Sequence, residues 1–281
     1  MSRSARIPFL AIGHTARDEF ADGRWRLGGS ALYGAATAAK LGADVTLVTR
    51  AGPKERDALA TLCQELGVRL RLLPGDVTTT FGFTYDAAGR RSLFLRAKAA
   101  PITRGEVGRS IGSPRAVLLA SIAGELDDSL FAPWSGAKRV LAAQGMLRSF
   151  GPDGLVIPSP WADYARLLPK VDAVVVSEED HAEDRAWLPY TTVVVTKAER
   201  GSDLHLGGVT VEVAPFAVPA VIDQTGAGDA FAASLALGLA EGLPPVEAAL
   251  FASAAASFAV EGLGMSRLAD RTRVLARMGA R

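Results

Sequence analysis

The chain of 281 residues has few of the residues that dictate special chemistry or a special environment. Its single cysteine, Cys63, excludes an internal disulfide and is typical of a reducing cytoplasm. The three histidines lie far apart in the sequence, without the paired spacing of zinc ligands. No uncharged apolar run approaches the roughly 18 residues of a membrane-spanning helix, and the apolar run near the N-terminus is too short for a secretory signal.

Neither basic nor acidic residues are in clear excess. Thirty-one basic residues face 30 acidic ones, for a net charge of +1, which indicates neither a nucleic-acid-binding arm nor an acidic tail. Two phosphate-binding patterns are missing, Gly-x4-Gly-Lys-Ser/Thr and Gly-x-Gly-x-x-Gly after the first strand, which disfavours Walker-type and dinucleotide sites. With 49% hydrophobic residues, the composition predicts a soluble cytoplasmic protein with a substantial core.

Apolar runs of strand length alternate with segments of helical periodicity along most of the chain. Strands are expected at residues 7–12, 45–49, 116–122, 139–143, 173–176 and 192–196. Helices are expected at residues 30–41, 54–66, 226–241 and 246–260. Continuous hydrophobic strands separated by helices are typical of a parallel sheet covered on both faces, so the fold class is predicted to be α/β. Because no repeat or long linker divides the chain, residues 1–281 are expected to form one domain.

Two segments, 20–27 and 78–96, interrupt this alternation and are predicted to form β-ribbons, the second with a turn at residues 86–89. Their arginines and aromatic residues suit a small flap over a cleft better than a core. Two edge hairpins without function are the alternative.

The most informative motif is Asp223-Gln-Thr-Gly-Ala-Gly-Asp-Ala-Phe231. It predicts a turn of very small side chains that leads directly into a helix, so that the first N–H groups of the helix are uncovered and can bind an anion. Asp229, in the first helical turn, would lie beside that anion as a proton acceptor. Donors for a phosphoryl group next to a carboxylate are what phosphoryl transfer to an alcohol requires. The alternative is an ordinary helix start with a flexible glycine entry.

The string Asp-x-Thr-Gly-Ala-Gly-Asp-x-Phe closely resembles the C-terminal signature of the ribokinase-like (PfkB) carbohydrate kinases. The segment from Gly28 to Ala35, followed by Leu41-Gly42, resembles the N-terminal Gly-Gly motif of the same family, and the likeness extends from Phe9 to about Gly264. The resemblance implies a three-layer α/β/α sandwich with a mainly parallel central sheet and a small β lid at about residues 15–29 and 78–97. It also implies an ATP- and Mg²⁺-dependent kinase with an alcohol acceptor, and lid ribbons that can pair in a homodimer.

The resemblance assigns roles to individual residues. Asp229 resembles the catalytic base, and Gly226, Ala227 and Gly228 resemble the anion hole. Residues matching positions that contact the sugar or polyol are Asp18, Gly28 and Gly29. Tyr33 is a further candidate at the substrate, as a group that stacks on a base or ring, and it leaves a nucleoside open as the acceptor. Residues matching positions around the nucleotide are Thr196, Lys197, Gly201, Gly228 and, beside the adenine, Ser253. Asp223 and Thr225 match positions that bind a monovalent cation, usually K⁺.

Three departures from the family pattern bear on these roles. The Asn-x-x-Glu motif appears as Ser177-Glu-Glu-Asp180, which retains a carboxylate for Mg²⁺ through water at Asp180 but lacks the amide. Ala198 stands where a glycine is common and is expected to crowd a phosphate or ribose contact. Ser30-Ala-Leu-Tyr33 replaces the Lys-Gly-Ala-Asn of ribokinase itself, which makes ribose a less favoured substrate.

One further stretch, residues 140–148, bears on the substrate. It ends a predicted strand with Gln144 and Arg148, and the carboxyl ends of strands line the crevice of α/β sheets. A similar Gln-Gly-x-x-Arg string occurs in relatives resembling inositol kinases, which favours a cyclic polyol such as myo-inositol. Glu125, after another strand, is also expected to face the site. The alternatives are a turn glutamine and a surface arginine at these positions, and, for the whole chain, a nucleoside kinase or a non-catalytic sugar- or nucleotide-binding protein.

Overall fold

The computed structural model describes residues 6–85, 91–108, 111–180 and 185–280. Within these residues, a nine-stranded sheet has the order β15-β14-β13-β12-β9-β8-β1-β4-β5. Seven of its strands are mutually parallel, and β14 and β15 add an antiparallel edge. The strands are β1 (Pro8–Ile12), β4 (Asp44–Arg50), β5 (Arg69–Leu73), β8 (Ala116–Ala120), β9 (Lys138–Ala142), β12 (Ala173–Ser177), β13 (Thr192–Thr196), β14 (Ser202–Leu206) and β15 (Val209–Val213).

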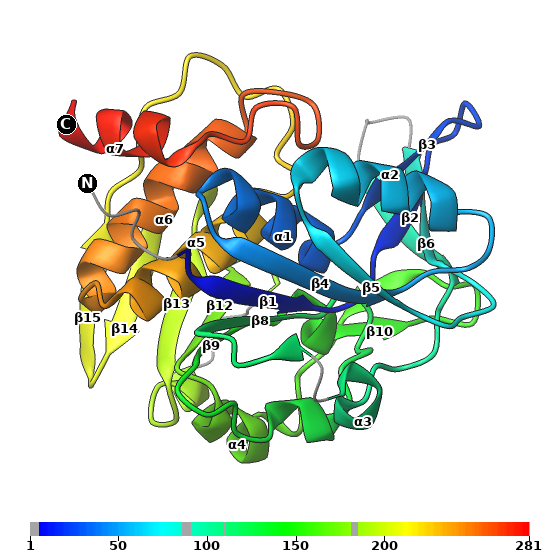
Figure 1. Cartoon of the computed structure of the whole chain (residues 1–281), viewed down its shortest axis with the longest axis horizontal. Helices are drawn as coiled ribbons and strands as arrows, with labels where there is room; N and C mark the ends of the chain where they lie inside the picture. Colours follow the sequence, from blue (N-terminus) through cyan, green and yellow to red (C-terminus); the bar gives the residue numbers. More distant parts are fainter. Residues whose placement is uncertain (1–5, 86–90, 109–110, 181–184, 281) are drawn as a thin grey trace.

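Helices cover both faces of this sheet and complete a three-layer α/β/α sandwich (Figure 1). One face carries α1 (Ser30–Lys40), α2 (Arg56–Leu66), α5 (Ala227–Glu241), α6 (Pro245–Ala259) and α7 (Arg271–Gly279). The other carries the short α3 (Arg104–Val107) and α4 (Tyr164–Leu167) together with single 3₁₀ turns. Each face has its own apolar core, because the buried strands present hydrophobic side chains in both directions. The predicted α/β class is confirmed.

A second, four-stranded sheet has the order β3-β2-β6-β7 and is referred to below as the small sheet. It consists of β2 (Ala16–Glu19), β3 (Trp25–Gly28), β6 (Thr79–Tyr85) and β7 (Arg91–Ala97). Its apolar side packs on the segment after β8 and on the hairpin of β10 (Arg148–Phe150) and β11 (Val156–Pro158), which places it over the carboxyl end of the large sheet.

The two predicted β-ribbons therefore join in one sheet. The predicted bounds of the first ribbon were wrong. Residues 20–24, predicted as strand, form the turn between β2 and β3, because Asp22 accepts a hydrogen bond from the N–H of Arg24 and Gly23 has a φ of 82°. The turn expected at 86–89 lies outside the described residues.

Most other predicted elements agree with the structure to within two residues, and Gly67 caps α2 in a left-handed conformation. The elements that were not predicted include β5, the antiparallel edge β14–β15 and the hairpin β10–β11. The strands β5, β14 and β15 contain charged residues and are less buried than the inner strands, so they lack a continuous apolar run. Within the described part of the chain, no helix combines the length and apolarity needed to cross a membrane.

Candidate active site

Loops from several parallel strands meet at the carboxyl end of the large sheet, where α/β proteins bind their ligands. Gln144 and Arg148 follow β9, and Asp180 follows β12. The side-chain amide of Gln144 donates to Oδ2 of Asp180 at 3.0 Å, and Nη2 of Arg148 lies 4.0 Å from Oδ1. The structure thus brings together two residues expected at the substrate and the carboxylate expected to serve Mg²⁺.

The glycine-rich turn begins α5. Gly226 has a φ of 85°, and a Cβ there would lie 2.2 Å from the ring of Tyr33, so only glycine fits between the turn and α1. Tyr33 itself is only 1% exposed and packs behind the turn. The first N–H groups of a helix lack partners within the helix, and here the N–H of Ala227 donates to the carbonyl oxygen of Gln224 at 3.3 Å.

Asp229 lies in the first turn of α5 and is half-buried. Burial raises the pKa of its carboxyl to about 6, against a hydrogen bond from Ser30 and the charge of Arg148, which both lower it. Ser30 is the first residue of α1, so the N-termini of α1 and α5 meet at this carboxylate. A carboxylate of raised pKa beside uncovered N–H groups can accept a proton from an alcohol while those groups hold an anion.

Asp18, Gly28 and Gly29 lie together where the small sheet leads into α1. A Cβ on Gly28 would lie 2.6 Å from Oδ2 of Asp18, so the absent side chain leaves room for that carboxylate. Gly29 has a φ of 96°, and its Cβ would lie 2.7 Å from the carbonyl oxygen of His14. Burial raises the pKa of the nearby Tyr33 to about 12, and the negative charges of Asp223, Asp18 and Asp229 act in the same direction.

Asp223 and Thr225, expected to bind a monovalent cation, contact a residue that sequence reasoning missed. Arg26 on β3 donates from Nη1 to Oδ2 of Asp223 at 2.9 Å and from Nη2 to Oγ1 of Thr225 at 3.2 Å. The two partners are 197 and 199 residues away along the chain. The only signal in the sequence was an arginine within a ribbon of alternating polar and apolar residues.

The residues expected around the nucleotide lie at the end of β13, in the turn after it, on α6 and, for Gly228, in the first turn of α5. Thr196 donates to the carbonyl oxygen of Val176, and Nζ of Lys197 contacts Oδ1 of Asp203 at 2.5 Å, so both side chains are engaged within the sheet edge. Ser253 is buried on α6. Ala198 has a φ of 49°, in the left-handed region, which explains why a glycine is favoured at this position.

Glu125 does not face the site as expected. It is completely buried, and its oxygens accept hydrogen bonds from the backbone N–H groups of His14, Ile122 and Ala123 and from the hydroxyl of Ser121. It therefore ties the end of β1 to the end of β8. His14 is likewise held locally, by Thr79 and the carbonyl oxygen of Ala100.

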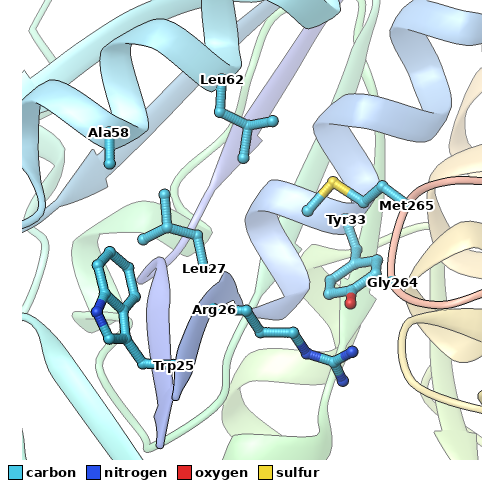
Figure 2. Close-up of a pocket in the computed structure, with 8 residues that line it drawn as sticks. All are labelled: Trp25, Arg26, Leu27, Tyr33, Ala58, Leu62, Gly264 and Met265. Carbon is cyan, nitrogen blue, oxygen red and sulfur yellow. The ribbon is translucent and has the colours of Figure 1, made fainter.

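Within the described residues, no three His, Cys, Asp or Glu side chains converge as a metal cluster. A pocket of about 370 Å³ opens between β3, α2 and the segment at Gly264, and of the expected site residues only Tyr33 lines it (Figure 2). Its full lining is Trp25, Arg26, Leu27, Tyr33, Ala58, Leu62, Gly264 and Met265.

Comparison with known proteins gives a consistent result. The family model described as pfkB family carbohydrate kinase matches residues 15–271. Inositol 3-kinase of Zea mays is 39% identical over 128 residues, which are 44% of this chain and 33% of that enzyme, so the match spans about a third of its length.

Solved structures show the same fold over nearly the whole chain. A pyrophosphate-dependent myo-inositol-1 kinase, converted by mutation into a myo-inositol-3 kinase, superposes with a TM-score of 0.78 at 21% identity, covering 97% of this chain and 99% of that one. Ribokinase of Arabidopsis thaliana, solved with ribose and ATP, gives a TM-score of 0.76 at 21% identity, covering 98% and 99%. The expected ribokinase-like sandwich is confirmed.

Proposed function

The chain belongs to the pfkB family of carbohydrate kinases and is a phosphotransferase acting on an alcohol group, and from this premise we propose that it phosphorylates a small cyclic polyol, such as myo-inositol, with ATP. The observation that carries the proposal is the carboxylate of Asp229, held at the start of α5 beside Ser30 and within electrostatic reach of Arg148. The similarity to a plant inositol 3-kinase and the pair Gln144 and Arg148 support a polyol over ribose.

In this proposal the acceptor lies between the small sheet, which acts as the lid of the single domain, and the carboxyl end of the large sheet. Asp18 and the backbone of Gly28 and Gly29 bind its hydroxyls, with Gln144 and Arg148 on the opposite side. Tyr33 completes this wall from behind the turn. Asp229 accepts the proton of the attacking hydroxyl late in the reaction, when bonding to phosphorus has made that hydroxyl acidic.

The donor phosphates lie at the start of α5 in this proposal, where the N–H groups of Gly226, Ala227 and Gly228 stabilise the charge on the transferring phosphoryl group. The remainder of the donor is surrounded by Thr196, Lys197, Gly201 and Ser253. Asp180 suits a magnesium ion held through water, because it is a single carboxylate that already accepts from Gln144. When bound, Mg²⁺ neutralises phosphate charge.

Pyrophosphate is the second candidate donor. The solved structures that resemble this chain include a pyrophosphate-dependent inositol kinase at a TM-score of 0.78, marginally above that of the ATP-bound ribokinase. The pairing of Lys197 with Asp203 also leaves fewer free cationic groups for a nucleotide.

The proposal is tested by assaying phosphorylation of myo-inositol, ribose, fructose, other hexoses and nucleosides, each with MgATP and with magnesium pyrophosphate. Turnover with a cyclic polyol is expected. Asp229→Asn should lower kcat by roughly 100- to 10,000-fold with little change in donor affinity, because only the proton acceptor is lost.

A nucleoside as the only productive acceptor would replace the substrate assignment. Equal turnover of the Asp229→Asn variant would refute the role of Asp229. If no acceptor is phosphorylated with either donor, thermal shifts with the same compounds would support a sugar-binding protein instead.

A further inference from the structure

Arg26 extends from the small sheet toward the turn that precedes α5. Successive residues of a strand point to opposite sides, and Trp25 and Leu27 lie toward α2 while the guanidinium of Arg26 lies toward Tyr33 and Gly264 (Figure 2). Arg26 is directly opposite Asp18 on the neighbouring strand, and its Nε lies 3.9 Å from Oδ2 of Asp18. One side chain thus lies between a carboxylate of the substrate wall and Asp223.

The carboxylate of Asp223 is fully engaged. Its Oδ1 accepts from the N–H of Thr225 at 2.9 Å, and its Oδ2 accepts from the N–H of Gly264 at 3.1 Å and from Arg26 at 2.9 Å. Burial opposes ionisation, yet the hydrogen bonds from Thr225, Gly264 and Arg26 hold the pKa of Asp223 at about 2. The carboxylate is therefore ionised, and its charge is balanced by protein.

A monovalent cation at Asp223 and Thr225, as the family resemblance implies, does not fit this arrangement. The guanidinium already contacts the side-chain oxygens of both residues, and a second positive charge beside it would be repelled. The side chains of Arg26 and Asp223 are 29% and 14% exposed, so bulk solvent screens such repulsion only in part.

We propose that the guanidinium of Arg26 takes the place of this monovalent cation, so that the protein needs no added K⁺ and its small sheet is tied directly to the turn before the anion hole. Arg26 is then a positioning residue. It acts through Asp223 and Thr225, which immediately precede Gly226. The planar guanidinium is suited to this because it offers two donors in fixed geometry, whereas an ammonium group is a single point of charge.

The first test does not require turnover. Thermal unfolding of the wild-type protein is measured in potassium, sodium and tetramethylammonium chloride at equal ionic strength, and the same Tm is expected in all three. A Tm that rises in potassium alone would overturn the proposal. Because this measurement needs no substrate, its result stands even if the proposed kinase activity, on which the catalytic part of the inference rests, is not found.

The second test uses turnover in the same three salts, with the acceptor found in the screen. Wild-type turnover is expected to be equal in all of them. Arg26→Gln should lower kcat by roughly 10- to 100-fold, as expected for loss of hydrogen bonds between charged groups, and Arg26→Lys should recover part of the loss.

Arg24→Gln is the matched control. Arg24 lies on the same ribbon, is 83% exposed and pairs only with Asp22 among the described residues, so turnover should change by less than about twofold. Wild-type turnover that collapses without K⁺, or an Arg26→Gln variant as active as wild type, would overturn the proposal. If Arg26→Gln does not fold, the salt series with the wild-type protein still tests the proposal.

Discussion

Asp229, the proposed proton acceptor, lies at the start of α5 in a position where burial makes its ionised form costly. Burial raises the pKa of its carboxyl to about 6, although Ser30 and Arg148 favour the ionised form. A proton acceptor with a pKa nearer to neutrality is a better base toward an alcohol than an ordinary aspartate, whose pKa is about 4. Because of this raised pKa, the ionised form of Asp229 lowers the stability of the folded protein.

We expect kcat to rise with pH through an apparent pKa of about 6, because only ionised Asp229 can accept the proton. Ser30→Ala should move this acidic limb to higher pH, since it removes a hydrogen bond that favours the carboxylate. The measurement is a pH–rate profile of both proteins. Ser234→Ala is the control on the same helix, because Oγ of Ser234 is buried and has no hydrogen-bond partner in the part of the chain that the structure describes, so its loss should leave the profile unchanged.

The free energy of unfolding should also depend on the ionisation of Asp229. A raised pKa stabilises the folded state at low pH relative to high pH, so the cost of ionised Asp229 appears as the pH rises from about 4 to about 6. Asp229→Asn should therefore be more stable than wild type above pH 6 by about 1–2 kcal/mol, allowing for partial exposure, and the difference should vanish near pH 4. Urea unfolding at both pH values measures it, and a gain in stability that persists at low pH would contradict this origin.

At the level of helices and strands, the helices α1 and α5 pack against each other through small residues. Most of the α1 face is alanine or glycine, and α5 is alanine-rich, so the two helix starts can approach closely enough to bring Ser30 to Asp229. Tyr33 is the largest residue of α1, and its ring lies against Gly226. We therefore expect the position of the proposed anion hole to depend on this contact between a ring and a glycine.

Gly226→Ala is predicted to damage the turn in two ways. The new Cβ would lie 2.2 Å from the Tyr33 ring, and an alanine would be strained at a φ of 85°. We expect a destabilisation of roughly 1–3 kcal/mol and a loss of kcat at unchanged acceptor binding, because the N–H groups move while Asp18 does not. Denaturant unfolding and steady-state kinetics would show both effects.

Tyr33→Phe separates packing from substrate binding at the same contact. The Tyr33 hydroxyl is buried and has no hydrogen-bond partner among the described residues, so its removal should leave the acceptor KM unchanged and stability equal or slightly improved. A clear rise in acceptor KM would show instead that the hydroxyl binds substrate.

The elements that could be predicted from the sequence are those whose signal is local. Buried strands such as β13 and β8 are continuous apolar runs, and the turn into α5 is a string of small residues that permits few alternatives. The edge strands β14 and β15 interrupt their apolar residues with polar ones, such as Asp203 and Glu212, and therefore lack the continuous apolar run that marks a strand. The contact of Arg26 with Asp223 could not be predicted, because it depends on how two segments 197 residues apart are placed by the whole sheet.

On the scale of the whole molecule, two further junctions join the small sheet to the body, besides the contact of Arg26 with Asp223. Apolar residues of β2 and β6 pack on Ile122 and Ala123, which follow β8. On the other side, Glu55 at the start of α2 accepts from Nη1 of Arg17 and from the hydroxyl of Thr78, both at 2.7 Å. Glu55 is only 4% exposed, so this polar junction operates away from bulk water, where such contacts are strongest.

Glu55→Gln should loosen the small sheet without altering the reacting groups. The amide can still accept from one partner, but the charge that holds Arg17 is lost, with an expected cost of about 1–3 kcal/mol. Because Asp18 lies next to Arg17 on β2, the acceptor KM should rise more than kcat falls. Hydrogen exchange of residues 16–28 should accelerate, while exchange in β8 at the centre of the large sheet stays unchanged.

Glu19→Gln is the matched control for this junction. Glu19 contacts the same arginine, at Nε and 2.8 Å, but its side chain is 43% exposed, so its contribution should be small. Unchanged exchange in the Glu55→Gln variant would mean that the apolar contacts with Ile122 and Ala123 hold the small sheet by themselves. Equally faster exchange in both variants would mean that both ion pairs of Arg17 hold the small sheet, and not the buried pair with Glu55 alone. Faster exchange in Glu55→Gln alone, together with the rise in KM, would show that the buried junction sets how firmly the small sheet closes over the acceptor.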